Sequence, residues 1–203
     1  EQLGIPIIEC ADYMETSALG RAEWMKFYGM LAGKEREADS LFAVVEHEYS
    51  RLSALAKTSR RKVKVITERN YGGVWSCPGG GSSMGRLIAD ANGRYVFASD
   101  GHSGSLSLAP ETVISKAADA DVWLFVYPGN RPLSAAELLA EYEGYRIMAA
   151  FKRGDIYECG SDVTSYFDEI SFRPDWLLRD LVRIFHPQLK IPGEQRYYKR
   201  LGS

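Results

Sequence analysis

The stretch Asp121–Val122–Trp123–Leu124–Phe125–Val126–Tyr127 decides the fold class, because Val122–Tyr127 is the longest purely apolar run in the chain. Its length is typical of a strand, and a strand with no polar alternation is buried on both faces. Helix signals flank it on both sides. Pro110 suits the first position of a helix running to Ala118, and Ser134 begins a capping box. The pattern predicts an α/β protein.

The same alternation of strand and helix extends outward in both directions. Strands are predicted over Lys62–Thr67, Gly72–Cys77, Arg94–Phe97, Asp121–Tyr127 and Asp155–Cys159. Further helices are predicted from Ser82 to Ala91, over Tyr145–Lys152, and from Pro174 to a stop at Pro187. Ser99–Ser107 reads as a polar loop. Such alternation is typical of a parallel sheet with right-handed crossovers.

The sequence before residue 60 follows a different pattern. Ile5–Cys10 reads as a short buried strand, and Arg21–Ala32 as a helix that ends at Gly33. Ala38–Ala56 then carries an apolar stripe at helical spacing, about 30 Å long. We therefore expect a boundary near residue 60. The chain opens on Glu1 rather than Met, so we expect a processed or truncated protein.

Composition excludes several classes of protein. Apolar residues make up 45% of the chain and the formal net charge is −2, so no basic excess favours nucleic acid or an anionic membrane. No apolar run has the length of a transmembrane helix. The cysteines Cys10, Cys77 and Cys159 form no CxxC pair. They are either small buried thiols or one disulfide and a leftover thiol.

Candidate site residues lie on three loops that should follow strands at the carboxyl edge of the sheet, where open α/β sheets bind ligands. These loops are Trp75–Ser83, Ser99–Ser107 and Gly160–Arg173. Their aromatic side chains favour a flat or bulky ligand, and the alternative is packing on the sheet edge.

Catalytic patterns are weak. Gly79–Ser83 could bind an anion through backbone N–H groups or form a tight turn, but the Gly-Lys-Ser/Thr ending of a phosphate loop is missing. Gly-x-Ser-x-Gly does not occur, and Asp100, His102 and Ser103 are too local to predict a triad. His102 is the candidate for a haem or metal contact. The pattern favours a binding protein and no enzyme.

An ordered series of segments resembles the class III, or cluster A-type, substrate-binding proteins of ABC importers for ferric siderophores, haem and cobalamin. The similarity is closest to iron-compound binders of Bacteroides-like bacteria. The segments are Pro6–Glu9, Leu19–Trp24, Gly33–Ala38, Val74–Trp75 before Pro78–Gly80, Ser107–Val113 and Phe172–Leu178. The resemblance implies a Rossmann-like, parallel-sheet C-terminal lobe preceded by a long connecting helix. It assigns residues 1–33 to a remnant of the N-terminal lobe, 34–60 to the connector and 61–203 to the C-terminal lobe.

The resemblance also implies roles for individual residues. Trp75 and Ser83 would face the ligand from the first loop, while Tyr166, Phe167 and Arg173 would line the wall of the lobe. An arginine there suits an anionic ferric chelate.

Glu111 matches the glutamate that docks an arginine of the membrane permease, and a helix-start glutamate without that role is the alternative. Gly104–Leu106 lacks the aromatic that cobalamin binders place there.

The resulting hypothesis is a periplasmic transport protein that delivers a ferric siderophore or related iron compound to an ABC permease in the inner membrane. No cofactor beyond the ligand is expected, nor any nucleic-acid partner. A lipid anchor could come from a leader outside this sequence. The alternatives are a cobalamin or haem carrier of the same family, a nucleotide-using enzyme of doubly wound fold, and a purely structural domain.

Overall fold

The computed structural model describes residues 7–202 and is built around a five-stranded sheet of order β4-β1-β6-β7-β8. The first four strands in that order are parallel, and β8 pairs antiparallel with β7. The strands are β1 (Val63–Thr67), β4 (Gly93–Tyr95), β6 (Val122–Tyr127), β7 (Ile156–Gly160) and β8 (Lys199–Arg200). The apolar run that decided the fold class is strand β6 in the middle of this sheet, so the predicted parallel α/β lobe is confirmed.

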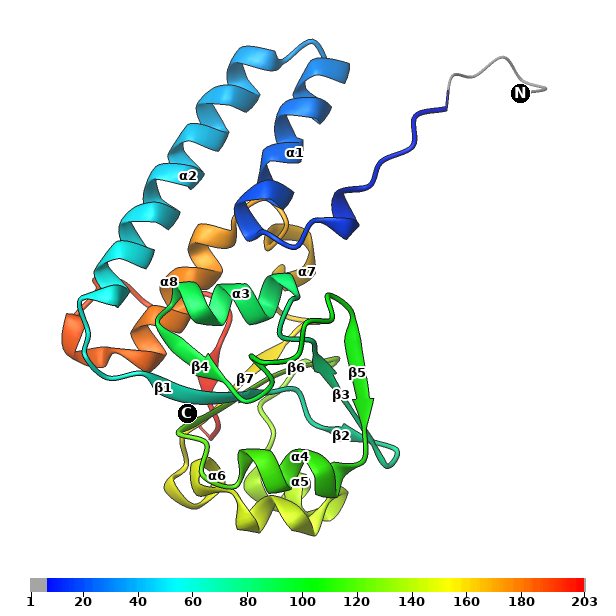
Figure 1. Ribbon diagram of the computed structural model, residues 1–203, viewed down its shortest axis with the longest axis vertical. Helices are drawn as coiled ribbons and strands as arrows, with labels where there is room; N and C mark the ends of the chain where they lie inside the picture. Colours follow the sequence, from blue (N-terminus) through cyan, green and yellow to red (C-terminus); the bar gives the residue numbers. More distant parts are fainter. Residues whose placement is uncertain (1–6, 203) are drawn as a thin grey trace.

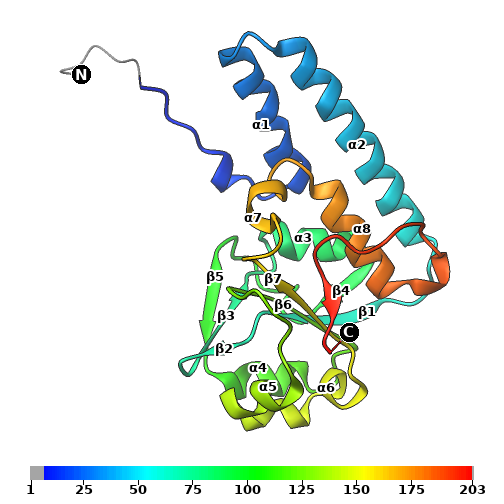
Figure 2. The ribbon, with the colours of Figure 1, turned by 180° about the vertical axis from the view of Figure 1, so that it is seen from behind.

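Helices cover both faces of the sheet (Figures 1 and 2). On one side lie α3 (Ser83–Asp90), α8 (Pro174–Phe185) and the short α7 (Tyr166–Glu169). On the other lie α4 (Pro110–Ala117), α5 (Ala135–Glu141) and α6 (Ala149–Arg153). The predicted caps are present: Ser82 accepts the N–H of Gly85, and Ser134 forms a full capping box with Glu137.

A second, antiparallel sheet stands beside the main one, and the sequence pattern did not predict it. It joins β2 (Asn70–Tyr71), β3 (Val74–Pro78) and β5 (Ser105–Leu108). The expectation that Ser99–Ser107 is entirely loop is therefore wrong, because Ser105–Leu108 pairs with β3. The strand predicted over Gly72–Cys77 forms as β3, but outside the parallel sheet.

The two N-terminal helices form an antiparallel hairpin that rises from the α3 and α8 layer (Figure 1). They are α1 (Ala18–Leu31) and α2 (Glu35–Lys57), so the predicted stripe Ala38–Ala56 lies within α2. A Cβ at Gly29 would lie 2.4 Å from that of Ala38, which shows how closely the helices approach. The strand expected at Ile5–Cys10 lies partly outside the described residues. Its described part, residues 7–10, is not a strand, and Ile7 is 83% exposed.

Two smaller expectations also changed. The helix predicted over Tyr145–Lys152 is split into a 3-10 turn, η2 (Glu143–Ile147), and α6, because Met148 has extended backbone angles. The three cysteines are free thiols, and Cys77 and Cys159 are buried.

Within residues 7–202, no helix has the length and apolar character needed to cross a membrane.

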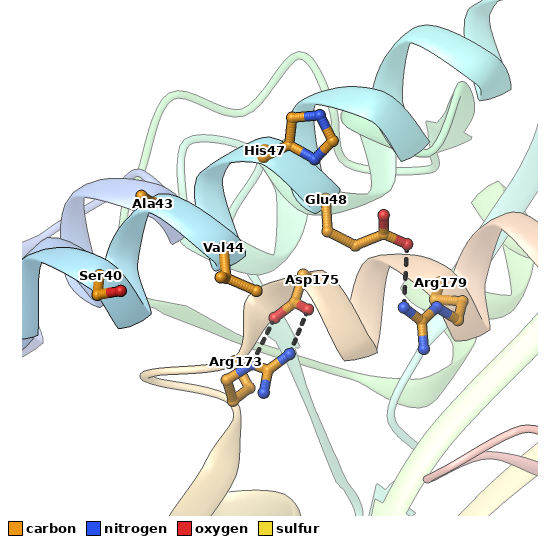
Figure 3. A pocket seen from close by; sticks show the side chains of 8 residues that line it. All are labelled: Ser40, Ala43, Val44, His47, Glu48, Arg173, Asp175 and Arg179. Atoms are coloured by element: carbon orange, nitrogen blue, oxygen red, sulfur yellow. Dashed lines mark hydrogen bonds and ion pairs between the residues drawn. The ribbon is translucent and has the colours of Figure 1, made fainter. Parts of the chain in front are cut away.

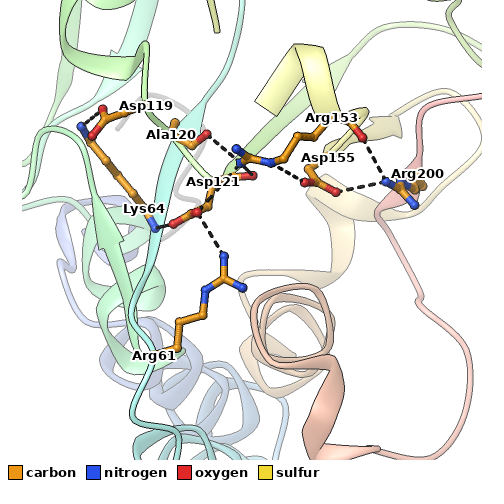
Figure 4. Close-up of polar contacts among 8 residues, drawn as sticks. All are labelled: Arg61, Lys64, Asp119, Ala120, Asp121, Arg153, Asp155 and Arg200. Atoms are coloured by element: carbon orange, nitrogen blue, oxygen red, sulfur yellow. Dashed lines mark hydrogen bonds and ion pairs between the residues drawn. The ribbon is translucent and has the colours of Figure 1, made fainter. Parts of the chain in front are cut away.

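Ionic contacts join the amino ends of the central strands (Figure 4). Asp121 accepts the backbone N–H of Lys64 at 2.8 Å and pairs with Arg61 at 3.0 Å. Asp155 pairs with Arg153 and Arg200, each at 3.0 Å. These contacts hold β1, β6 and β7 in register at that edge.

Candidate functional site

Strand order places a candidate site at the carboxyl ends of β1 and β6. The chain runs from β1 outward to β4 and then returns to the other side of β1 as β6, so the direction of winding reverses between them. Ligands of open α/β sheets bind in the crevice outside such a reversal. Glu68, the residue that follows β1, lies at this point, and its backbone N–H donates to Leu124 of β6 at 2.8 Å.

Glu68 has two unusual properties. Its φ of 60° lies in the left-handed region, which a glutamate seldom adopts. Burial raises the pKa of its carboxyl to about 7, although the N–H of Val126 and the charge of Arg69 act in the opposite direction. The sequence analysis missed Glu68. The available signal was a charged pair, Glu68–Arg69, directly after a buried strand.

A hollow of about 320 Å³ lies outside the ends of β6 and β7. Glu158 lines it and is 4% exposed; its carboxylate accepts the N–H of Leu133 at 3.0 Å, and burial raises its pKa. The cations Arg131, Arg196 and Lys199 also line this hollow. The sequence analysis did not single out these cations, although Arg196 and Lys199 flank a pair of tyrosines in the C-terminal segment.

Trp75 and Tyr166 are core residues, so their predicted contact with ligand is wrong for this structure. Trp75 is 0% exposed, and its indole N–H donates to the carbonyl of Thr67 at 3.0 Å. Tyr166 is 3% exposed and packs edge-on against Tyr197 with ring centroids 5.5 Å apart. Tyr166 comes after β7, whereas Trp75 lies within β3, and each side chain turns inward to cover apolar surface.

Phe167 and Ser83 keep positions from which a ligand could be reached. Phe167 on α7 is 66% exposed, and its ring rests edge-on against Tyr166 at 5.2 Å. Ser83 is half-buried at the start of α3, where it lines a water-sized hollow of about 50 Å³ beside Arg21 and Ile170. The structure therefore does not bring the five predicted ligand residues together on one surface.

Arg173 faces the underside of α2 (Figure 3). Its guanidinium forms a bidentate pair with Asp175, at 2.9 and 2.7 Å, and lies 3.7 Å above the ring of Trp176. The hollow it lines, of about 600 Å³, also contains His47 and the Glu48–Arg179 ion pair. An anionic ligand at Arg173 would have to compete with the carboxylate of Asp175.

The glycine loop is a close-packed turn. Gly79 and Gly81 donate their N–H groups to the carbonyls of Gly104 and His102, at 2.8 and 3.0 Å. A Cβ on Gly80 would lie 2.3 Å from the carbonyl of Phe97. Of the two hypotheses for Gly79–Ser83, the tight turn is therefore confirmed and the anion-binding loop is not.

His102 extends into solvent and contacts Asp100 at 2.9 Å. No group of three metal-ligating side chains occurs in the described part of the chain.

Glu111 lies exposed in the first turn of α4, where the helix dipole favours a carboxylate. Its Oε1 accepts the hydroxyl of Tyr142 at 3.3 Å. Among residues 7–202, no Lys or Arg forms an ion pair with it. Glu111 is thus an accessible carboxylate, and the structure does not identify a partner protein for it.

The mostly parallel sheet with helices on both faces, together with the α1–α2 hairpin that precedes it, defines a Rossmann-like α/β lobe. Residues 1–163 match the family described as "Periplasmic binding protein", and the chain belongs to that family.

Similar proteins agree with this assignment. An "uncharacterized lipoprotein" of Methanocaldococcus jannaschii is 32% identical over 194 residues, which cover 93% of this chain and 44% of the relative. A second lipoprotein of that organism is 26% identical over 196 residues, which cover 93% of this chain and 48% of that relative. The chain thus spans about half the length of these curated relatives.

Solved structures with the same fold include a periplasmic heme-binding protein of Pseudomonas aeruginosa, with a TM-score of 0.71 and 15% identity. The match covers 93% of this chain and 66% of that one. A possible iron-binding, periplasmic solute-binding protein of Staphylococcus epidermidis has a TM-score of 0.70 and 19% identity, over 91% and 68% of the two chains. At these identities the likeness concerns the fold.

Proposed function

We propose that this chain is part of the solute-binding component of an ABC importer, which captures a ferric siderophore or related iron compound outside the cytoplasm. The observation that carries the proposal is the family match over residues 1–163. The iron-binding and heme-binding names of proteins with the same fold support this ligand class. The lipoprotein names of the relatives support a lipid-anchored location facing the periplasm or its equivalent.

In this proposal, residues 61–203 form one wall of the ligand cleft, residues 34–60 connect the lobes, and residues 1–33 belong to the opposite lobe. Phe167 is the exposed ring that contacts the ligand. Ser83 and Arg173 lie at the margin of the cleft. Arg196 and Lys199 add positive charge near the ends of β6 and β7, which suits an anionic chelate.

Calorimetric titration with ferric citrate, a ferric hydroxamate, haemin and cyanocobalamin tests the ligand class. The titrations should be run on the full-length natural protein and, in parallel, on this chain. We expect saturable binding of one iron chelate by the full-length protein and weaker binding by this chain, because a single wall buries less of the ligand. Saturation by haemin or cyanocobalamin alone would support the carrier alternatives. No saturable binding of any of the four would contradict the proposal.

Two matched variants test the position of the ligand. Phe167→Ala should weaken binding about tenfold or more, because an exposed ring in a binding site contributes affinity. It should change the free energy of unfolding by less than about 0.5 kcal/mol. Tyr13→Ala removes another exposed ring, on η1 (Asp12–Met14), and should leave affinity unchanged. Equal affinities for the two variants would remove Phe167 from the site.

A further inference from the structure

The hollow outside the ends of β6 and β7 is lined by charged groups of both signs. Glu158 of β7 is 4% exposed, whereas the cations Arg131, Arg196 and Lys199 are exposed. A buried carboxylate is costly unless a hydrogen-bond donor or a cation faces it. What the hollow can bind therefore depends on which of these charges the protein already neutralises.

Two of the three cations are neutralised by neighbouring carboxylates. Arg131 pairs with Glu137, and Arg196 pairs with Glu169. Lys199 differs from them, because in the described part of the chain no carboxylate forms an ion pair with its ammonium. Of these three cations, Lys199 is therefore the one that remains free to meet a ligand.

Strand pairing places Lys199 beside Glu158. The two residues are directly opposite each other in the antiparallel pair of β7 and β8. Side chains at such positions lie on the same face of a sheet, with their Cβ atoms about 5 Å apart. Among residues 7–202, however, no ion pair joins them, and Glu158 forms none with another cation. A carboxylate and an ammonium thus border the same hollow, and both can interact with a third group.

The backbone around the hollow is closely packed. A Cβ on Gly160 would lie 2.7 Å from the carbonyl oxygen of Gly129, so the loops after β6 and β7 touch. The backbone N–H of Ser161 donates to the carbonyl of Tyr127 at 2.9 Å, and the Thr164 hydroxyl donates to that of Gly160 at 3.0 Å. The hollow is therefore formed before a ligand arrives, which lowers the entropy cost of binding.

The environment of Glu158 favours a cationic group at this position. Its carboxylate accepts the backbone N–H of Leu133 at 3.0 Å. Burial nevertheless raises its pKa, and the nearby charge of Glu137 acts in the same direction. An ammonium at this carboxylate would stabilise its charged form. A group that is only anionic would be repelled by Glu158, so the hollow is complementary to a group that carries both charges.

We propose that this hollow binds an amino-acid group of the ligand, with the ammonium at Glu158 and the carboxylate at Lys199. The inference rests on the proposed function and deepens it, since it names a chemical group that the iron chelator carries. The volume of about 320 Å³ is at the lower end of small-molecule sites. It suits such a group, while the rest of the chelate lies outside the hollow.

Three small probes test the need for both charges: glycine, acetate and methylammonium. Each is titrated into this chain in an isotope-labelled sample, and the backbone amide signals are followed by NMR. We expect glycine to bind at least about tenfold more tightly than either other probe, because only glycine gains both ion pairs. The amide signal of Leu133 should shift on binding, because its N–H donates to Glu158.

Three other results would overturn the inference. Acetate that binds as tightly as glycine would make the hollow a simple anion site. Methylammonium that binds as tightly as glycine would make it a simple cation site. If the Leu133 and Gly160 signals stay fixed at about 0.1 M of every probe, the hollow binds none of these groups.

Matched variants assign each charge to its residue. Glu158→Gln keeps an oxygen for the N–H of Leu133 and should weaken glycine binding about tenfold or more, without weakening acetate binding. Lys199→Gln should weaken glycine binding as much, without weakening methylammonium binding. Lys116→Gln, on exposed α4, is the control and should change neither.

Unchanged glycine affinity in either hollow variant would overturn the inference. Glu158→Gln with parent affinity would show that a neutral side chain is sufficient. Lys199 lies on the exposed strand β8, so Lys199→Gln keeps the test decisive if Glu158→Gln does not fold.

Calorimetry on the full-length protein separates this inference from the proposed function. Binding of an iron chelate there, with no glycine binding in the hollow, would overturn the inference alone. Glycine binding in the hollow, with no binding of any of the four chelates, would contradict the proposed function. In that case the hollow would stand as a site for a free amino acid.

Discussion

The two edges of the central sheet are held together in different ways. At the amino edge, Asp121 and Asp155 join three strands through ion pairs and backbone hydrogen bonds (Figure 4). At the carboxyl edge, order comes from buried rings and from loops in backbone-to-backbone contact, such as Gly79–Gly81 against residues 97–104. Near the middle of that edge, Glu68 combines a buried carboxyl with a left-handed backbone conformation.

The difference bears on the proposed position of the ligand. Ion pairs at the amino edge satisfy its charges internally. At the carboxyl edge Lys199 and the ring of Phe167 are exposed, and Arg196 is exposed while paired with Glu169. Polar groups with strained backbone or shifted pKa gather at functional sites of proteins. The amino edge of the sheet is thus tied by ion pairs, and we propose that the carboxyl edge is the one that binds the ligand.

The largest expected effect concerns the loops of the carboxyl edge. Gly80→Ala should destabilise the protein by about 3 kcal/mol, because its Cβ would lie 2.3 Å and 2.5 Å from the carbonyl oxygens of Phe97 and Asp100. Gly101→Ala is the matched control in the facing loop, where nothing lies within 4 Å of the new Cβ. Urea unfolding of both variants measures the difference. Similar midpoints would mean that these loops are not close-packed.

The next effect concerns the amino edge. Asp121→Ala should lower the free energy of unfolding by about 2–3 kcal/mol, because the N–H of Lys64 loses its acceptor and two arginines lose a counter-charge. Asp119→Ala, which breaks a solvent-exposed pair with Lys64, should cost less than about 0.5 kcal/mol. Added salt should reduce the difference in free energy of unfolding between Asp121→Ala and the parent, because salt screens the ion pairs. A difference that does not change with salt would assign the loss of stability to the hydrogen bond alone.

The smallest effect is a pH dependence at Glu68. Its pKa is raised in the folded state to about 7 from 4.5, so the native protein holds a proton that the unfolded chain releases. Stability from this group should fall as pH rises from about 4.5 to about 7, then level off. Glu68→Gln keeps a side-chain oxygen that can accept the backbone N–H of Val126, but its amide does not titrate. The difference in free energy of unfolding between Glu68→Gln and the parent should grow in favour of the variant across that range and then stay constant. Parallel stability curves for the two proteins would place the Glu68 carboxyl in water.

Much of the fold could be predicted because its signals are local. The stripe of α2, the Ser82 and Ser134 caps and the apolar run of β6 each need only a short window of sequence. The β2–β3–β5 sheet could not be predicted in this way. Ser105–Leu108 alternates serine and leucine in a polar context, and its partner β3 lies about 30 residues earlier in the chain. Pairing at that distance depends on tertiary contacts.

The site was harder to predict because burial is not a local property. Trp75 lies in β3 just before a run of glycines and serines, and Tyr166 follows β7, yet both are covered by rings from distant segments. Glu68 and Arg69 look like a solvated turn, although Glu68 is largely enclosed and Arg69 pairs with Glu141. Charge and aromaticity predicted which residue types matter, and only the topology showed which of them face outward.

The burial of the tryptophans has an optical consequence. Trp75 and Trp123 are 0% exposed and in mutual contact, while Trp24 and Trp176 are partly exposed. The first pair should emit at shorter wavelength and resist quenching by acrylamide. Trp176, which lies against two guanidinium groups, should respond to any anion that draws Arg173 or Arg196 away. The protein therefore carries two fluorescent populations, one that reports on the core and one that reports on the surface near the site.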